Sequence, residues 1–157
     1  MIKNSVTRVY DNAGSDRLFG CWLPTGKRVR LDLHAGRWRL ANVNGRYVAV
    51  VFDRPGERRD VIVWAKLGPS PARMVAYTFP TSTDPPAAQL YVSKHGAVAF
   101  SSLSTIGYIA PLVPGQAPRY RELDSGPRVS APSLWADEQA GRLRWRNGGL
   151  RKSARWR

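Results

Sequence analysis

The chain has 157 residues, which is enough to bury a core as one domain and too few for two well-built domains. Hydrophobic residues make up 43% of it, and its six Trp, six Tyr and four Phe exclude a disordered chain despite a formal net charge of +14. No stretch approaches the roughly 18 consecutive apolar residues of a membrane span, and residues 1–10 lack the apolar segment of a signal peptide. We therefore expect one soluble domain over 1–157, with its compartment undetermined.

The spacing of apolar residues predicts fourteen short strands and no amphipathic helix. A representative run, Tyr47–Phe52, is β-branched and aromatic and follows the turn signal Asn44-Gly45. The links are mostly short, which favours antiparallel pairing of neighbours, because a parallel crossover needs a dozen residues or more. The predicted strands are 6–10, 17–23, 28–32, 38–42, 46–53, 60–67, 73–78, 88–93, 97–102, 106–112, 119–123, 133–137, 142–146 and 151–156.

A strand, a polar turn with a glycine, and a second strand recur along the chain. The copies cover residues 39–50, 90–100 and, more weakly, 134–145. Their glycines, Gly45, Gly96 and Gly141, are 51 and 45 residues apart, which is the length of a propeller blade. The pattern predicts an all-β fold of antiparallel four-stranded blade-like repeats, a small or partial β-propeller.

The predicted strands group into four units, of which the first and last look incomplete. The units are roughly 6–32, 38–78, 88–123 and 133–156. A ring of blades needs closure because open edges invite pairing with another chain. Either the ends meet within one chain or two chains complete a larger ring. An irregular β-sandwich is the alternative fold.

Segments 19–31, 45–49 and 133–149 resemble β-propeller-like repeat proteins of actinobacteria, most of them uncharacterised. The resemblance covers most of the chain and implies the fold, but it transfers no functional residue. Such proteins often look exported, whereas no signal sequence is visible here.

No catalytic, nucleotide-binding or cofactor motif is present. The two histidines, His34 and His95, lack the ligand-spaced partners of a metal site. Cys21 is the only cysteine, so no intramolecular disulfide can form, and we expect it to be buried beside Trp22. We therefore expect a protein that is not an enzyme and needs no cofactor.

A glycosidase-type pair of carboxylates is the alternative to this view, because a propeller brings distant strands to one face. We favour a structural role for these groups, as turn residues and as partners of arginine. The candidates are Asp53, Asp60, Asp124 and Asp137.

The C-terminal hairpin carries the clearest local signal. Arginines alternate with Leu143 and Trp145, so the arginines share one face while the apolar pair points to the core. A two-residue turn at either Asn147-Gly148 or Gly148-Gly149 places the arginines of the returning strand on the same face. The predicted anion-binding residues are Arg142, Arg144, Arg146, Arg151 and Arg155.

Like charges opposite one another destabilise a hairpin, so a polyanion or an acidic protein would compensate for them. The alternative is a solvated strand edge whose repulsion prevents aggregation. Trp38 and Trp156, next to basic residues, could stack on bases of single-stranded nucleic acid, whereas Trp22, Trp64, Trp135 and Trp145 are expected in the core.

These observations favour a non-enzymatic binding or protein-interaction scaffold with a basic, anion-preferring face, which could assemble as a homodimer through its incomplete end units. The alternative is a nucleic-acid-binding protein that uses the C-terminal arginine hairpin. Carbohydrate binding or hydrolysis has no residue-level signal.

Overall fold

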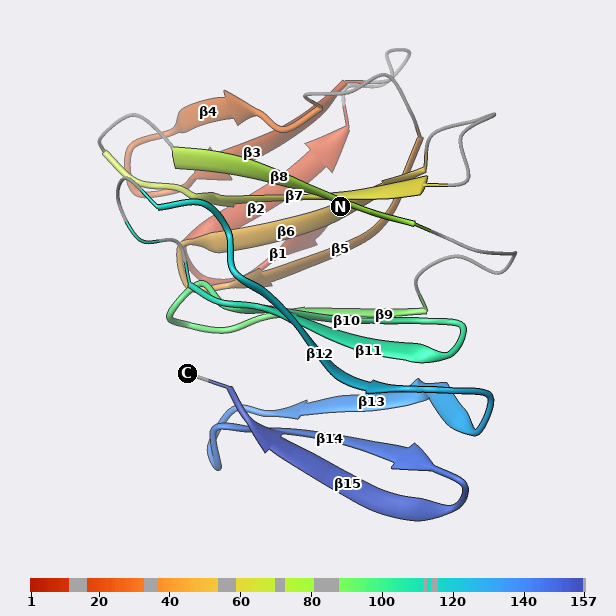
Figure 1. Ribbon diagram of the computed structural model, residues 1–157. Helices are drawn as coiled ribbons and strands as arrows, with labels where there is room; N and C mark the ends of the chain where they lie inside the picture. Colours follow the sequence, from red (N-terminus) through yellow and green to blue (C-terminus); the bar gives the residue numbers. More distant parts are fainter. Residues whose placement is uncertain are drawn as a thin grey trace.

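In the described part of the chain the regular secondary structure consists of β-strands, arranged as four antiparallel sheets that follow one another along the chain (Figure 1). The computed structural model describes residues 1–11, 17–32, 37–53, 59–69, 73–80, 88–111, 113 and 116–156, and for a few of them, such as Asp53, only the backbone. In each sheet the strands are hydrogen-bonded in sequence order, so every connection within a sheet joins neighbours.

The first sheet contains β1 (Ile2–Lys3), β2 (Thr7–Asp11), β3 (Leu18–Trp22) and β4 (Lys27–Arg30). The second contains β5 (Arg37–Asn44), β6 (Tyr47–Asp53), β7 (Arg59–Lys66) and β8 (Arg73–Pro80). The third contains β9 (Gln89–Val92), β10 (Val98–Ser102), β11 (Thr105–Ile109) and β12 (Tyr120–Ser125). The fourth contains β13 (Val129–Asp137), β14 (Arg142–Asn147) and β15 (Leu150–Arg155).

The predicted all-β fold of antiparallel, blade-like units is confirmed, and each of the fourteen predicted strands overlaps an observed one. The first unit, however, is not incomplete as predicted, because β1 gives it a fourth strand. This strand has two residues, too few to show an alternating pattern. Its turn is closed by Asn4, whose side-chain oxygen accepts hydrogen bonds from the backbone N–H groups of Val6 and Thr7 at 2.9 and 2.8 Å.

The repeated glycines occupy equivalent places in three sheets. Gly45, Gly96 and Gly141 each lie between the first and second strands of a sheet, with φ of 55°, 87° and 59°. This left-handed conformation favours glycine. At Gly96 a side chain is also excluded by space, because a Cβ would lie 2.5 Å from the ring of Tyr47 in the neighbouring sheet. The repeat therefore marks a turn that each of these sheets uses in the same way.

Three apolar cores hold successive sheets together. One lies between the first and second sheets, one between the second and third, and one between the third and fourth. The second sheet is covered on both faces, because Val48 and Val50 pack toward the first sheet while Ala49 and Val51 pack toward the third. Burial of both faces explains the uninterrupted apolar runs of β6 and β7.

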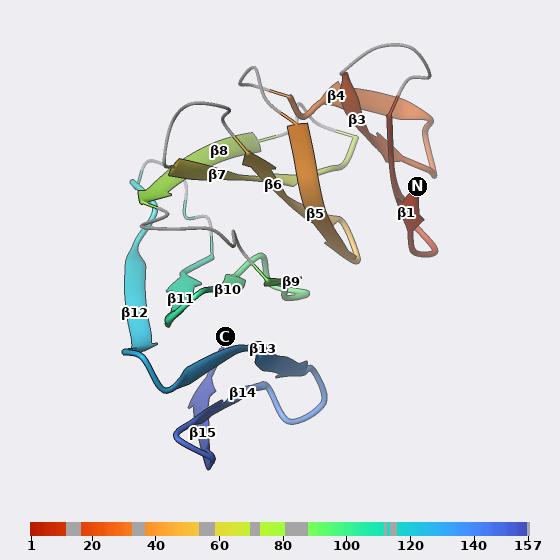
Figure 2. The same ribbon diagram turned by 90° about the vertical axis from the view of Figure 1, so that its right-hand side faces the viewer.

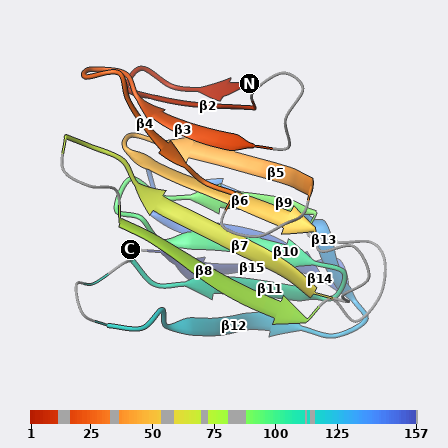
Figure 3. The same ribbon diagram turned by 90° about the horizontal axis from the view of Figure 1, so that it is seen from above.

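The four sheets form an array with the first and fourth sheets at its two ends (Figure 2). Seen from above, the second, third and fourth sheets overlie one another (Figure 3). The first strands of the sheets lie on one side of the array, and β5 contacts both β1 and β9. This arrangement is compatible with propeller blades, while closure of a ring stays a prediction. Among the described residues no helix is long and apolar enough to cross a membrane.

Candidate anion-binding face

The hairpin of β14 and β15 has the predicted register. Arg142 lies opposite Arg155, Arg144 opposite Ser153, and Arg146 opposite Arg151. The turn is Gly148-Gly149, and both residues have positive φ, as a tight hairpin with the twist of the flanking strands requires. All five arginines are exposed on one side of the sheet, which we call the arginine face.

The opposite side of the hairpin is buried against the third sheet. Leu143, Trp145 and Trp156 belong to the core between the third and fourth sheets. Asp124 of β12 fixes this contact, because its two carboxylate oxygens accept hydrogen bonds from the Trp145 indole N–H at 2.6 Å and from the Asn147 amide at 3.0 Å. The arginine face is thus carried by a sheet that is anchored from behind.

Strand β13 extends the arginine face by a third strand. Asp137 lies opposite Arg142, and Trp135 lies opposite Arg144. The Arg144 guanidinium donates to the Asp137 carboxylate at 2.9 Å, and its Cζ is 5.4 Å from the centroid of the Trp135 ring. Arg144 is thereby held in place by an ion pair and a cation–π contact at the centre of the face.

The remaining arginines are less engaged. Arg142 donates to the Ser153 hydroxyl at 3.0 Å, and the backbone N–H of Arg146 donates to the Ser133 hydroxyl at 2.8 Å. Within the described part of the chain, the guanidinium groups of Arg146, Arg151 and Arg155 have no ion-pair or hydrogen-bond partner. Two arginine pairs, Arg142 with Arg155 and Arg146 with Arg151, therefore repel each other across the strands without a carboxylate between them.

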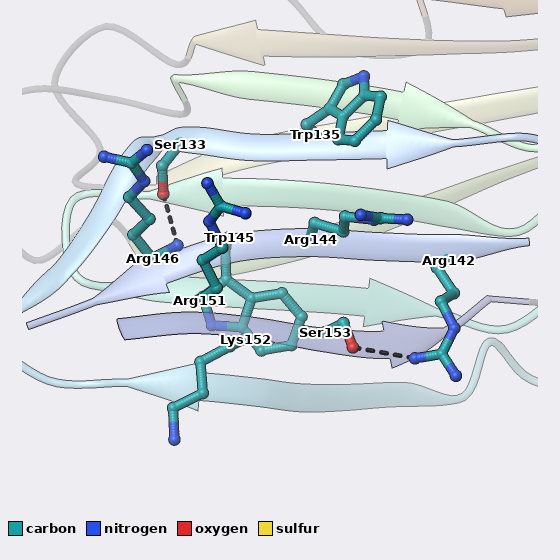
Figure 4. A pocket seen from close by; sticks show the side chains of 9 residues that line it. All are labelled: Ser133, Trp135, Arg142, Arg144, Trp145, Arg146, Arg151, Lys152 and Ser153. Atoms are coloured by element: carbon teal, nitrogen blue, oxygen red, sulfur yellow. Dashed lines mark hydrogen bonds between the residues drawn. The ribbon is translucent and has the colours of Figure 1, made fainter. Parts of the chain in front are cut away.

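A shallow hollow of about 570 Å³ runs over this face (Figure 4). Side chains of all three strands contribute to it, and the close view shows Trp135 and Arg144 on adjacent strands (Figure 4). Its lining residues are Ser133, Trp135, Arg142, Arg144, Trp145, Arg146, Arg151, Lys152 and Ser153. Two of them, Trp145 and Lys152, form a cross-strand pair that alternates with the arginines and belongs to the other side of the hairpin.

Trp135 is 52% exposed, so the prediction that it lies in the core is wrong. The pairing of β13 with β14 is irregular between Ser130 and Trp135, and the strand leaves Leu134 facing the core and Trp135 facing out. The alternation of Leu134 and Ala136 with Ser133, Trp135 and Asp137 is the signal that would have assigned these three to the face.

The other tryptophans are placed by the cores. Trp64 and Trp145 are buried as predicted, and Trp22 packs against the first core while half-buried. Trp156 is only 2% exposed, and Trp38 is half-buried against the first core, so neither is the exposed stacking platform suggested for it. Cys21 is not buried but half-exposed, because it lies on the outer side of β3.

The candidate carboxylates are distributed over several sheets. Asp60 is buried on β7, and Asp124 accepts hydrogen bonds from Trp145 and Asn147. Asp137 forms an ion pair with Arg144, as expected for a partner of arginine. The side chain of Asp53 and the whole of His34 lie outside the described part. In the described segments no three His, Cys, Asp or Glu side chains gather as a metal site would require.

A second hollow, of about 260 Å³, lies where the turn of β9 and β10 meets the turn of β13 and β14. It is lined in part by Lys94, His95, Glu138 and Trp156. Partial burial raises the pKa of Glu138, against the opposing influence of Lys94, the Asn44 side chain and His95. This hollow joins the turns of adjacent sheets and is smaller than the one on the arginine face.

Comparison with known proteins finds no protein-family model and no curated protein that matches this chain.

Proposed function

We propose that the protein is a non-enzymatic binding scaffold that holds a polyanion on the arginine face of the fourth sheet. The observation that supports this is the cross-strand pairing of Arg142 with Arg155 and of Arg146 with Arg151. Each pair costs up to about 1 kcal/mol in an isolated hairpin. An anion seated between the guanidinium groups offsets that repulsion.

The guanidinium group suits this role. Its planar fork of donors matches phosphate and carboxylate oxygens, and it keeps its charge at any physiological pH. Three of the five groups are free of other described partners, so they can turn to a ligand without breaking an ion pair. A phosphate polymer, an acidic polysaccharide and an acidic protein segment share the chemistry that this face recognises.

The test is the salt dependence of polyphosphate binding. Each lost arginine contact is expected to lower the slope of log affinity against log salt by roughly one. The double variant R146Q/R151Q should therefore lower the slope by about two and weaken binding at low salt. The control R119Q removes one exposed arginine that immediately precedes β12, away from the arginine face, and should leave the slope almost unchanged. Absence of binding at low salt, or an equal loss in both variants, would refute the proposal.

Single-stranded nucleic acid is the second candidate, and the exposure of Trp135 favours it. A base stacked on this ring would lie beside Arg144, with phosphates within reach of the remaining arginines. An oligothymidylate should quench the fluorescence of Trp135, and W135F should lose that quenching while its affinity for polyphosphate is retained. Quenching that persists in W135F would exclude base stacking at this position.

A further inference from the structure

The outer side of the first sheet carries a second arrangement of basic and aromatic side chains. The register places Lys3, Arg8, Cys21 and Arg28 in one row across the four strands. The next row contains Tyr10, Phe19 and Arg30. The side chains between these, such as Val9 and Leu18, point the other way into the first core. The first sheet thus presents a face at the opposite end of the array from the arginine face (Figure 2).

Two aromatic rings form the centre of this face. Tyr10 and Phe19 are stacked with their ring centroids 5.9 Å apart and their planes 25° apart, and both are half-buried. The Arg8 guanidinium carbon lies 5.3 Å from the centroid of the Tyr10 ring. The arrangement combines flat π surfaces with a cation that already contacts one of them.

The charges around the rings are largely positive. Lys3, Arg8 and Arg28 are exposed and share one row without a carboxylate in it. Arg30 differs, because its guanidinium donates to Asp32 at 2.8 Å, which raises the pKa of Arg30. The cations of the first row are therefore the ones that a ligand anion meets.

We propose that the outer side of the first sheet is a second ligand surface, which binds single-stranded nucleic acid. Its bases stack on the Tyr10–Phe19 pair, and its phosphates lie against Arg8 and Arg28. Every base has a π face, so stacking on a sheet surface needs no particular sequence, and a basic row beside the rings follows the backbone. A duplex hides its base faces, and a polyphosphate has none, so only a single strand uses both features.

This surface shares no residue with the arginine face of the fourth sheet, so the proposal for one surface can be refuted while the proposal for the other stands. The experiment starts from R146Q/R151Q, in which binding at the fourth sheet is weakened. Fluorescence anisotropy of a labelled oligothymidylate at low salt then reports mainly on the first sheet. In that background Y10L should weaken oligothymidylate binding about tenfold, which is about 1.4 kcal/mol.

Two further variants distinguish the contribution of base stacking to binding from the contribution of charge and from an effect on folding. Y10F keeps the ring and should restore oligothymidylate binding, whereas R8Q/R28Q should weaken both oligothymidylate and polyphosphate and lower the salt slope by about two. Y10L should leave polyphosphate binding unchanged. R119Q, which removes a single charge away from this face, again serves as the control and should leave both affinities almost unchanged.

Three results would overturn the proposal. One is an equal loss of oligothymidylate and polyphosphate binding in Y10L, which would assign Tyr10 a purely structural role. Another is duplex DNA binding as tightly as the single strand and insensitively to Y10L, which would indicate charge alone. The third is no oligothymidylate binding at all in the R146Q/R151Q background while the unmodified chain binds, which would leave the arginine face as the site and remove the first sheet from consideration.

Discussion

At the scale of single residues, Asp124 links the third sheet to the fourth. Its carboxylate accepts hydrogen bonds from the Trp145 indole and the Asn147 amide, and both donors are on β14. A buried donor that loses its partner costs about 1–3 kcal/mol, because it gives up water without a replacement. The free energy of unfolding therefore depends on this side chain more than on an ordinary exposed carboxylate.

We expect D124A to lower the free energy of unfolding by about 1–3 kcal/mol, since it orphans the indole N–H of a tryptophan that is only 5% exposed. D124N keeps one acceptor oxygen and should lose less. Denaturant unfolding followed by tryptophan fluorescence measures both, with E122A, an exposed carboxylate on the same strand, as the control. Equal losses in D124A and E122A would show that the hydrogen bonds contribute nothing.

Single residues also show where sequence reasoning stops. Alternation placed the arginines of the hairpin correctly, because a two-residue turn fixes which side chains share a face. It did not reveal the hydrogen bonds of Asp124 with Trp145 and Asn147, because a contact between two sheets produces no periodic pattern in the sequence. It also missed the row of Arg8 and Arg28, although Lys27–Arg30 and Thr7–Asp11 each alternate; that face emerges only when the four strands are aligned.

At the scale of elements, the strands could be predicted from the sequence, but the packing of neighbouring sheets against them could not. The apolar run of β6 predicts a strand from its composition, but burial of both its faces follows only from sheets on either side. The two-residue β1 was beyond any periodic signal. Trp135 faces outward because it lies opposite Arg144 in the regular part of the pairing between β13 and β14, so it shares the exposed face of the arginines.

The hairpin of β14 and β15 couples stability to binding. Arg146 faces Arg151, so R151E turns a repulsive cross-strand pair into an attractive one. We expect R151E to raise the free energy of unfolding by a few tenths to about 1 kcal/mol and, in the same protein, to weaken polyphosphate binding. R151Q should give an intermediate stability, because it removes the repulsion without adding attraction.

Thermal unfolding and polyphosphate titration of the same samples check this prediction. A gain in Tm with a loss of affinity indicates that the chain keeps a costly charge arrangement for its ligand. If R151E is no more stable than the unmodified chain, solvent already screens the arginine pair, and repulsion between the two arginines does not favour a bound anion. A solvated edge that only prevents aggregation would instead show a gain in Tm without any change in affinity.

At the scale of the whole molecule, both ends of the array are basic. Lys3, Arg8 and Arg28 lie on the outer side of the first sheet, and the five arginines lie on the outer side of the fourth sheet. These two sheets stand at the two ends of the array (Figure 2). The three inner contacts between sheets are apolar, as a stack of blades requires. The two outermost surfaces are therefore basic, whereas the surfaces that hold the sheets together are apolar.

This difference bears on the homodimer predicted from the sequence. If the end sheets of two copies met, arginines would face arginines, and the contact would be repulsive over roughly 10 Å at moderate salt. We therefore expect the chain alone to remain monomeric at low salt, and a polyanion that spans two copies to be the agent that brings them together. Light scattering at low and high salt, with and without an oligothymidylate, measures the mass in each state.

The masses measured under these four conditions of salt and ligand distinguish the possibilities. A monomer that gains mass only with the oligonucleotide at low salt supports an array whose ends bind anions. A dimer that persists at low and high salt without ligand would instead mean that the end sheets complete each other across chains, and the charge argument would be wrong. The combined variant R8Q/R28Q/R146Q/R151Q tests whether the two basic faces cause the association, because it removes charge from both ends of the array. If this variant no longer gains mass with the oligonucleotide while R119Q still does, the association is assigned to the two basic faces.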